Sequence, residues 1–229
     1  MTAARLGRPR LHLRTTTSTN DRARALAAAG APHGTLVTAG EQTAGRGRQG
    51  RTWSAPPGST LLLSLVLRDP PELLPLAAAL AVAEVAGDEA QIKWPNDVLL
   101  GGRKIAGILA EGRPQDGWAV LGIGLNVALR VEDLPPELHG TAGTLGLEPG
   151  DLEPALQRLL GALERTLGLG GARLLEAYRA RDALRGREVS WAGGRGRAAG
   201  IDGEGRLVVE LSGGGRTALS AGEVHLGRH

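Results

Sequence analysis

The stretch Ile92-Lys-Trp-Pro-Asn-Asp-Val-Leu-Leu-Gly-Gly-Arg-Lys-Ile-Ala-Gly107 contains both lysines of this 229-residue chain, Lys93 and Lys104. Its apolar runs on either side of Gly101-Gly102 predict a β-hairpin, because a Gly-Gly pair between such runs is typical of a tight hairpin turn. A second turn is expected just before this hairpin, at Pro95-Asn96-Asp97. The stretch therefore places both lysines on a small group of short strands.

The scarcity of lysine and asparagine singles out three segments. The other 25 basic residues (27 minus the two lysines) are arginine, and asparagine occurs only at positions 20, 96 and 126. A lysine ammonium is compact and an arginine guanidinium is a planar fork, so one does not replace the other at a tight charge-stabilising site. The surviving lysines and asparagines therefore mark candidate functional segments around residue 20, from 93 to 104, and around 126.

Apolar and glycine patterns predict the elements on either side of this stretch. Helices are expected after a capping Ser18-Thr19-Asn20-Asp21 sequence, over residues 73–86, and over 152–184 with a break near 168–171. Strands are expected at residues 11–13, 34–39, 59–67 and 119–129, the last of them central in its sheet. From residue 188 the sequence pattern changes to short predicted strands separated by Gly-rich turns. These strands are expected at residues 188–191, 196–202, 205–211 and 223–226. This predicts a small, separate β-barrel, so we divide the chain into residues 1–185 and 186–229.

Composition excludes several functional classes. Cysteine is absent, which removes disulfides, thiolate zinc sites and cysteine nucleophiles and fits a reducing cytoplasm. The five histidines show no metal-ligand spacing, and no apolar run is long enough to span a bilayer. A basic nucleic-acid-binding module is a rival interpretation, but a net charge of +3 and an aromatic content of 2% argue against it.

The loop Gly45-Arg-Gly-Arg-Gln-Gly-Arg-Thr-Trp53 is the most distinctive candidate site. It contains a G-x-G-x-x-G pattern, but Pro56 and Pro57 follow where a dinucleotide-binding fold needs a helix. Three guanidiniums on a glycine-rich backbone suit a polyanion such as a nucleotide triphosphate. A solvated basic loop is an equally good interpretation of the spacing alone.

Three further sites have both a functional and a structural interpretation. Lys104, on an apolar strand, could stabilise charge on a phosphoryl or carboxyl oxygen or could simply extend to the surface. Asn126, within an apolar run next to Gly124, must find hydrogen bonds from a ligand or from the backbone. Ser18-Thr19-Asn20 could bind a ligand or cap a helix. Trp94 is expected to serve packing.

Taken in order, these segments resemble the biotin–protein ligases. The resemblance rests on Ser18-Thr19-Asn20, residues 41–53, Lys93-Trp-Pro-Asn-Asp97, residues 102–109 and residues 122–127, with weaker similarity at Gly203-x-Gly-x-Leu and Gly222-Glu-Val-x-Leu. It implies an α+β catalytic domain like that of class II aminoacyl-tRNA synthetases, with a mixed and largely antiparallel sheet, and a small C-terminal SH3-like barrel. Because the first segment begins at residue 18, we expect the monofunctional type without the N-terminal DNA-binding domain.

The resemblance also implies a reaction and a role for each segment. Biotin would be activated by ATP, as its Mg²⁺ complex, to biotinyl-5′-AMP and then transferred to a lysine of an acceptor protein. The implied biotin-binding residues are Ser18, Thr19, Asn20, Gln42, Arg46, Gly47, Arg48 and Lys104. The implied ATP- or adenylate-binding residues are Arg51, Trp53, Lys93, Asn96 and Asn126. Lys104, Arg48 and Asp97 would be catalytic, with Lys104 neutralising charge between carboxylate and α-phosphate and Asp97 positioning or deprotonating the incoming lysine. No metal-binding residue is assigned.

The implied partner is the biotin carboxyl carrier domain of acetyl-CoA carboxylase or a related carboxylase, in the cytoplasm, with no DNA or membrane partner and a possible homodimer. The nearest rival is a lipoate ligase or octanoyl transferase, which has the same fold. The arginine loop and Lys93-Trp-Pro-Asn-Asp97 favour biotin over that rival.

Overall fold

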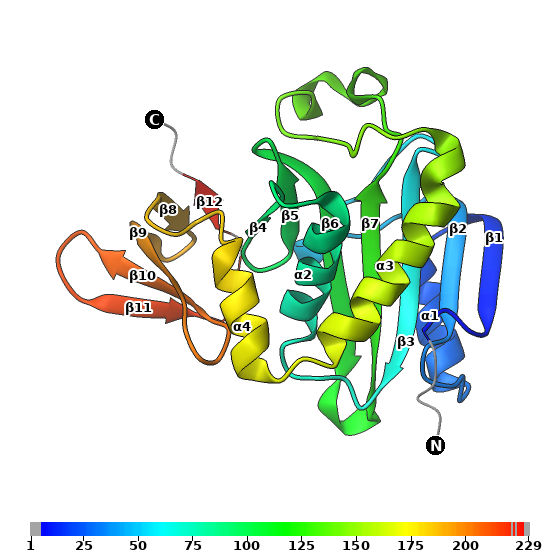
Figure 1. Cartoon of the computed structure of the whole chain (residues 1–229), viewed down its shortest axis with the longest axis horizontal. Coiled ribbons are helices and arrows are strands. Elements are labelled where there is room, and N and C mark those ends of the chain that lie inside the picture. The colour runs from blue at the N-terminus through cyan, green and yellow to red at the C-terminus, as the bar shows by residue number, and fades with distance from the viewer. Residues whose placement is uncertain (1–5, 221, 223, 227–229) are drawn as a thin grey trace.

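The computed structural model describes residues 6–220, 222 and 224–226, and its larger part is a seven-stranded mixed sheet (Figure 1). The strand order is β1-β2-β3-β7-β6-β5-β4, in which only β1 and β2 pair in parallel. The strands are β1 (Arg10–Thr16), β2 (Leu36–Gln42), β3 (Thr60–Arg68), β4 (Gln91–Lys93), β5 (Asp97–Leu100), β6 (Arg103–Arg113) and β7 (Trp118–Asn126).

β7 lies at the centre of this sheet, as its apolar sequence predicts. It pairs with β3 over the whole strand, from Thr60–Asn126 to Arg68–Trp118, and with β6 on its other side. β3 is buried along nearly all of its length. Strands covered on both faces read as continuous apolar runs, which explains why the sequence locates β3 and β7 but does not reveal which face each side chain occupies.

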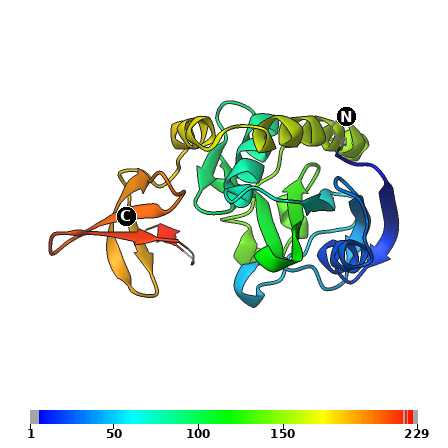
Figure 2. The same ribbon diagram turned by 90° about the horizontal axis from the view of Figure 1, so that it is seen from below.

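Helices cover both faces of the sheet (Figures 1 and 2). α1 (Thr19–Ala28) packs on one face against β2, β3 and β7 and encloses a small core of Ala23, Ala27, Val37, Val66 and Val120. α2 (Leu74–Ala86) and α3 (Leu152–Leu167) cover the other face and one another. Within the described ranges, no helix has both the length and the apolar character required to cross a bilayer.

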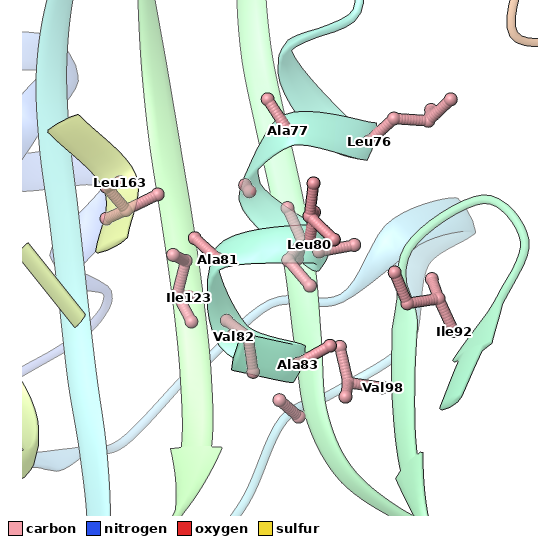
Figure 3. Packing of buried hydrophobic residues seen from close by; sticks show 14 of the residues in the cluster. Leu76, Ala77, Leu80, Ala81, Val82, Ala83, Ile92, Val98, Ile123 and Leu163 are labelled. Carbon is pink, nitrogen blue, oxygen red and sulfur yellow. The ribbon is translucent and has the colours of Figure 1, made fainter. Parts of the chain in front are cut away.

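α2 is apolar on every side because the sheet and α3 enclose it. Leu80 and Val82 lie in the same packed layer as Ile123 of β7 and Leu163 of α3 (Figure 3). The helix ends at Gly87, whose φ of 103° glycine adopts at little cost. Both the extent and the end of this helix agree with the sequence prediction.

The predicted hairpin is present as β5 and β6. Gly101 and Gly102 have φ angles of 56° and 75°, so both central turn residues are left-handed, as a type I′ turn requires. The predicted turn at Pro95-Asn96-Asp97 joins β4 to β5. The pairing shifts register between Val98 and Leu99, which leaves Ile105 of β6 as an extra residue.

The C-terminal part is a five-stranded antiparallel sheet with the order β11-β10-β9-β8-β12. Its inner residues Ile201, Leu207 and Val209 belong to the same hydrophobic cluster as α2 and α4 (Gly171–Ala180), so this sheet packs against the main part of the chain, and the division at residues 185 and 186 stays a prediction. Trp94 of the main sheet also donates from Nε1 to the Gly205 carbonyl (3.0 Å). The strands are β8 (Glu188–Trp191), β9 (Gly194–Ile201), β10 (Leu207–Leu211), β11 (Arg216–Leu219) and β12 (His225–Leu226).

Two strands of this sheet differ from the sequence prediction. β11 is absent from the sequence prediction, since the glycines at 213–215 conceal so short a strand. The strand predicted at residues 223–226 is observed only as β12, and Glu223 lies outside the described residues.

The start of α1 is where the sequence places it, but its cap is different. Ser18 is the N-cap residue, yet its side chain makes no capping hydrogen bond. Gln42, at the end of β2, supplies the acceptor instead: its Oε1 accepts from the Thr19 backbone N–H (2.7 Å). A side chain 23 residues away therefore satisfies one of the free N–H groups of the helix.

The segment after α4 contains a partly buried carboxylate, that of Asp182. Asp182 Oδ1 accepts from the Leu184 backbone N–H (2.8 Å), but Oδ2 is buried and has no hydrogen-bond partner among the described residues. Burial raises the pKa of Asp182 above its ordinary value. The buried hydroxyl of Tyr178, one helical turn earlier, also lacks a described partner.

We expect an Asp182→Asn variant to lose part of the pH dependence of folding stability. With a raised folded-state pKa, the native protein keeps a proton that the unfolded chain releases, so the free energy of unfolding falls as pH rises from about 3.9, the ordinary aspartate value, through the folded value. Urea unfolding across this pH window should show that the free energy of unfolding of the variant increases relative to that of the parent as pH rises. Asp88→Asn, at a fully exposed side chain, is the matched control. Identical pH slopes for Asp182→Asn and the parent would contradict the argument.

Candidate functional site

All fourteen residues singled out in the sequence line one cavity of about 500 Å³. They come from the N-terminus of α1, the end of β2, the arginine loop, the β4–β5 turn and strands β6 and β7. They are Ser18, Thr19, Asn20, Gln42, Arg46, Gly47, Arg48, Arg51, Trp53, Lys93, Asn96, Asp97, Lys104 and Asn126. The fold therefore gathers segments that lie more than a hundred residues apart, while the individual roles stay predictions.

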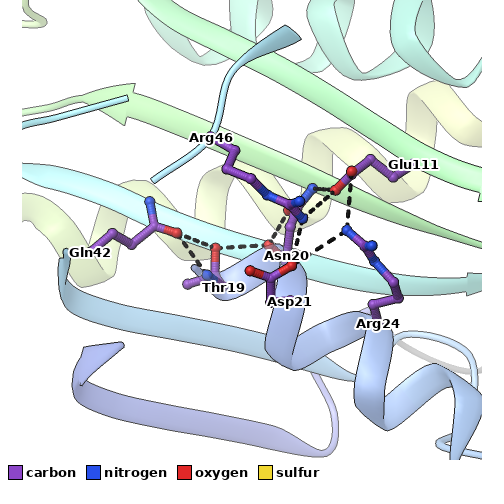
Figure 4. A network of polar contacts seen from close by, with 8 residues as sticks. Thr19, Asn20, Asp21, Arg24, Gln42, Arg46 and Glu111 are labelled. Atoms are coloured by element: carbon purple, nitrogen blue, oxygen red, sulfur yellow. Dashed lines mark hydrogen bonds and ion pairs between the residues drawn. The ribbon is translucent and has the colours of Figure 1, made fainter. Parts of the chain in front are cut away.

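One end of the cavity is formed by a chain of polar side chains (Figure 4). Gln42 Oε1 lies 3.0 Å from Thr19 Oγ1, which lies 2.8 Å from Ser64 Oγ. Ser64 Oγ is 2.6 Å from Asn20 Oδ1, and Asn20 Nδ2 donates to Glu111 Oε2 (2.7 Å). We call these five residues the polar chain. Thr19, Asn20 and Ser64 are buried, so their orientations are set by these contacts rather than by solvent.

Four charged side chains close a ring at the Glu111 end of the polar chain. Arg46 Nη2 lies 2.6 Å from Asp21 and 3.3 Å from Glu111, and Arg24 Nη2 lies 3.4 Å from Asp21 and 3.1 Å from Glu111. The ring is partly exposed, so each pair contributes modestly to stability. Its effect is geometric, since it joins the arginine loop to α1 and β6.

The arginine loop is a closed hairpin rather than a freely extended loop. Trp53 N–H donates to the Gly45 carbonyl (2.9 Å), and Gly47 N–H donates to the Arg51 carbonyl (2.7 Å). A Cβ at Gly45 would meet the Trp53 carbonyl and the Gln42 amide, so only glycine fits there. Arg48 Nη1 donates to Asn96 Oδ1 (3.0 Å), which ties the loop to the β4–β5 turn.

Lys104 faces the cavity because of the register shift in β6. Asp97 pairs with Gly107, and the extra residue Ile105 brings Lys104 opposite Leu99 instead of Leu100. Leu99 and Asp97 lie on the same face of β5, so the shift turns Lys104 to the Asp97 side. Lys104 Nζ is 2.7 Å from Asp97 Oδ1 and 5.5 Å from the centre of the Trp53 ring. The ammonium is thus held between a carboxylate and an aromatic face.

Trp53 lies on a patch of sheet that has no side chains. A Cβ at Gly124 would come within 2.5 Å of the indole, and one at Gly107 within 3.0 Å. These glycines face each other across β6 and β7. The indole Nε1 is buried and has no hydrogen-bond partner among the described residues. The glycines next to Asn126 therefore allow close approach, as the sequence suggests, and the approaching group is an indole.

Asn126 holds the rim of the cavity in place. Its Nδ2 donates to the Gly143 carbonyl (2.8 Å), and its Oδ1 accepts from Thr60 Oγ1 (3.2 Å). The same rim segment pairs with the Lys104 backbone, through Lys104 N–H to Thr141 and Gly143 N–H to Lys104. Partners within the protein therefore satisfy the Asn126 amide in this structure, and contact between Asn126 and a ligand stays a prediction.

Sequence reasoning missed several residues of the site. Ser64 and Glu111 complete the polar chain, and Leu134, Leu138 and residues 140–142 form the rim. Ser64 carries a signal in hindsight, because it is a hydroxyl inside an otherwise apolar strand and must find partners. Glu111 follows the segment 102–109 on the same strand, β6. A charged side chain on such a strand also needs a partner or solvent. The described residues contain no group of three His, Asp or Glu side chains that could bind a metal ion.

The fold and the site define an α+β protein with a cationic, glycine-floored cavity suited to an elongated anionic ligand. Residues 12–127 match the Biotin/lipoate A/B protein ligase family, and residues 185–227 match the Biotin protein ligase C terminal domain. The chain belongs to the biotin/lipoate protein ligase family.

Individual relatives cover most of the chain. A bifunctional ligase/repressor BirA of Bacillus subtilis is 37% identical over 233 residues, covering 92% of this chain and 71% of that protein. A biotin--[acetyl-CoA-carboxylase] ligase of Mycobacterium tuberculosis is 40% identical, covering 91% of this chain and 85% of that protein. Among solved structures, a biotin protein ligase from Aquifex aeolicus in complex with biotin and ATP superposes with a TM-score of 0.82 at 28% identity, covering 97% of this chain and 100% of that one.

We predict that Asn126→Ala destabilises the protein by about 1–3 kcal/mol, the usual cost of leaving a buried polar group without its partner. The variant removes both the donor to the Gly143 carbonyl and the acceptor for the Thr60 hydroxyl. Urea unfolding measures the change. Asn126→Asp keeps the shape of the side chain but places a carboxylate oxygen, an acceptor, against the Gly143 carbonyl oxygen. It should therefore lower the free energy of unfolding by at least as much. Parent-like stability in both variants would show that Asn126 does not hold the rim.

Proposed function

We propose that this chain is an ATP-dependent biotin–protein ligase that makes biotinyl-5′-AMP and transfers biotin to a lysine of a biotin carboxyl carrier protein or domain of a carboxylase. The observation that carries this proposal is that the fourteen residues implied by the resemblance line a single cavity. Two relatives named biotin--[acetyl-CoA-carboxylase] ligase, covered over 85% and 98% of their own lengths, and a similar structure holding biotin and ATP support it.

In the first step an oxygen of the biotin carboxylate attacks the α-phosphorus of ATP, which enters as its Mg²⁺ complex, and pyrophosphate leaves. Two anions must approach one another, so a fixed positive charge between them lowers the barrier. Lys104 is the group suited to this role, since Asp97 and Trp53 hold its ammonium in the cavity. Arg48 and Arg51 supply further positive charge from the loop.

The arginine loop is suited to keeping the adenylate from water. It lies along the cavity and is tied to the site by two side-chain links, Arg48 to Asn96 and Arg46 to the charged ring. A mixed anhydride is quickly hydrolysed in bulk water, so a loop fixed over it protects the intermediate. We assign this covering role to Arg46, Gly47 and Arg48.

In the second step the amine of the acceptor lysine attacks the anhydride carbonyl, an amide bond forms, and AMP leaves. The attacking nitrogen must lose a proton. Asp97 is the acidic side chain at this point in the cavity, but in the structure it pairs with Lys104. Its assigned role of positioning or accepting from the incoming ammonium therefore requires that it exchange partners once Lys104 is engaged by the adenylate.

The domain assignment follows the same reasoning. We place the catalytic unit at residues 1–185 and the C-terminal unit at 186–229, near the start of the match to the C-terminal domain family.

The deciding experiment is pyrophosphate release from ATP with biotin, lipoate, octanoate or no acid. Release with biotin alone is the expected result. Pyrophosphate release with lipoate or octanoate would favour the rival ligase of the same family. No release with any acid, from correctly folded protein, would contradict an adenylating role.

Lys104→Arg should lower the rate of adenylate formation by at least about 100-fold, the usual loss when one preorganised charge-stabilising donor is misplaced. The variant keeps the positive charge, so folding should be unaffected, but the larger planar group cannot occupy the same point between Asp97 and Trp53. Single-turnover formation of biotinyl-5′-AMP measures the effect, with thermal unfolding as the control. Near-normal turnover would remove Lys104 from the mechanism.

Gly124→Ala should weaken ATP binding about tenfold or more, because the added methyl group displaces the Trp53 indole assigned to the adenine. Isothermal titration of an ATP analogue with a non-cleavable α,β-bridge, in the presence of biotin, measures the affinity without turnover. Gly150→Ala is the matched control, since no atom lies within 4 Å of its added Cβ and it is outside the cavity. Unchanged ATP affinity in Gly124→Ala would exclude the Trp53 assignment.

A further inference from the structure

The charged side chains that line the cavity of the candidate site are mostly cationic. Among the described residues of its lining, five side chains carry positive charge and one, Asp97, is a carboxylate. The five cations are Arg46, Arg48, Arg51, Lys93 and Lys104. Three of them belong to the arginine loop, so closing this loop over the cavity brings like charges together. The closed position therefore needs negative charge, either from a ligand or from the protein.

The arginine loop has little packing of its own to hold it closed. None of the residues 46–52 is buried. Residues 46–48, 51 and 52 line a second cavity of about 810 Å³ as well as the first, so the loop is a wall between two cavities. A segment with few buried apolar contacts opens easily unless its edges are fixed. The position of the loop consequently depends on polar contacts at its edges.

Two carboxylates outside the first cavity supply negative charge at one edge of the loop (Figure 4). Arg46 Nη2 lies 2.6 Å from Asp21 Oδ1 and 3.3 Å from Glu111 Oε2. Asp21 belongs to α1 and Glu111 to β6, and neither is among the residues that line the first cavity. Arg24 Nη2 contacts the same two carboxylates but lies farther from Asp21, at 3.4 Å. Of the two arginines, Arg46 is thus the closer partner of Asp21.

We propose that Asp21 and Glu111 form a permanent latch on the arginine loop: through Arg46 they hold the loop closed with negative charge that does not leave with a product. Both are positioning residues, since neither lines the cavity assigned to the ligand. They act on the reaction by keeping the loop in place. Asp21 and Glu111 come from α1 and β6, so the latch joins the loop to two elements of the folded core.

This inference rests on the proposed function and deepens it. ATP brings several negative charges into the cavity, and most of them leave with pyrophosphate. The adenylate that remains has a single negative charge, on its phosphate, against five cationic side chains. The attraction between ligand and loop is therefore weakest when the reactive anhydride has to be kept from water. The two carboxylates of the latch offset that loss of negative charge.

The latch predicts how pyrophosphate release divides into two phases when biotin and ATP are supplied without an acceptor protein. A burst measures adenylate formation, and the slower linear phase measures how often the adenylate is lost and the site turns over again. Asp21→Asn removes one charge of the latch at nearly constant shape. We expect its burst to equal that of the parent and its linear phase to be about two- to fivefold faster, the usual effect of losing an exposed ion pair.

Three further variants test whether this effect acts through Arg46. Glu84→Gln is the matched control, because Glu84 pairs with Arg165 between α2 and α3 at 3.1 Å, and it should leave both phases unchanged. Arg24→Gln leaves both carboxylates to Arg46, so its linear phase should not be faster. Adding Asp21→Asn to Arg46→Gln should increase the linear rate no further than Arg46→Gln alone. An equal increase in Arg24→Gln and Asp21→Asn would indicate a general loosening and would overturn the latch.

Limited digestion with trypsin measures loop opening without any ligand. Trypsin cleaves after arginine, and cleavage of a loop that opens and closes rapidly follows the population of its open form. Cleavage after residues 46, 48 and 51, identified by mass spectrometry, should be about two- to fivefold faster in Asp21→Asn and in Glu111→Gln than in the parent. Glu84→Gln should be cleaved there at the parental rate.

The two measurements separate failure of the latch from failure of the ligase reaction. Faster loop cleavage in both variants, with no pyrophosphate release by the parent, would contradict the ligase reaction and leave the latch in place. A burst in the parent, with parental loop cleavage in Asp21→Asn and Glu111→Gln, would overturn the latch. Faster cleavage with an unchanged linear phase would overturn its role in retaining the adenylate.

Discussion

The constraint on which the site depends is a bare area of the central sheet. Gly107 of β6 faces Gly124 of β7, and Ser64 of β3 faces Gly122. Residues directly opposite in an antiparallel pair share one face, so these four positions form a surface without large side chains beside α1. Asn20 lies over Gly122 and Trp53 over Gly124, each too close for a Cβ. A side chain at either glycine would fill the cavity from below.

The same alternation separates chemistry from packing. The apolar residues of β3 and β7 on the opposite face, such as Leu63, Leu65 and Ile123, pack in the core with α2 and α3. The polar and glycine positions lie on the α1 face. Lys104 belongs to this polar face only through the extra residue in β6, since an unshifted register would direct it to the other side. The placement of the Lys104 ammonium in the cavity is thus a property of strand pairing rather than of the lysine's immediate neighbours in sequence.

How much of this could be predicted from sequence depends on the range of the interaction. The hairpin at Gly101-Gly102 and the end of α2 at Gly87 follow from local backbone preferences, and both were predictable. Glu111 was not, because its partner Asn20 lies 91 residues away and nothing in either segment names the other. The prediction of a local side-chain cap on α1 failed for the same reason. Serine is a common N-cap residue, but here the acceptor comes from Gln42 on a neighbouring strand. The rarity of lysine and asparagine led to residues that line one cavity, and it did so without requiring knowledge of contacts, while their roles stay predictions.

The C-terminal sheet contacts the β4–β5 turn of the site through Trp94. Trp94 is buried and donates to the Gly205 carbonyl in the β9–β10 turn, and Gly205 itself lies against Leu76 of α2 and against Leu73, which immediately precedes that helix. Only one residue separates Trp94 from Asn96, which holds Arg48, and Asp97 follows with Lys104. A shift of the C-terminal sheet would therefore reach both the arginine loop and the ammonium through a single turn. The Trp94 indole therefore serves packing, as its sequence context suggests. Because Asn96 and Asp97 follow it closely in the chain, the packing of Trp94 also helps to set the geometry of the cavity.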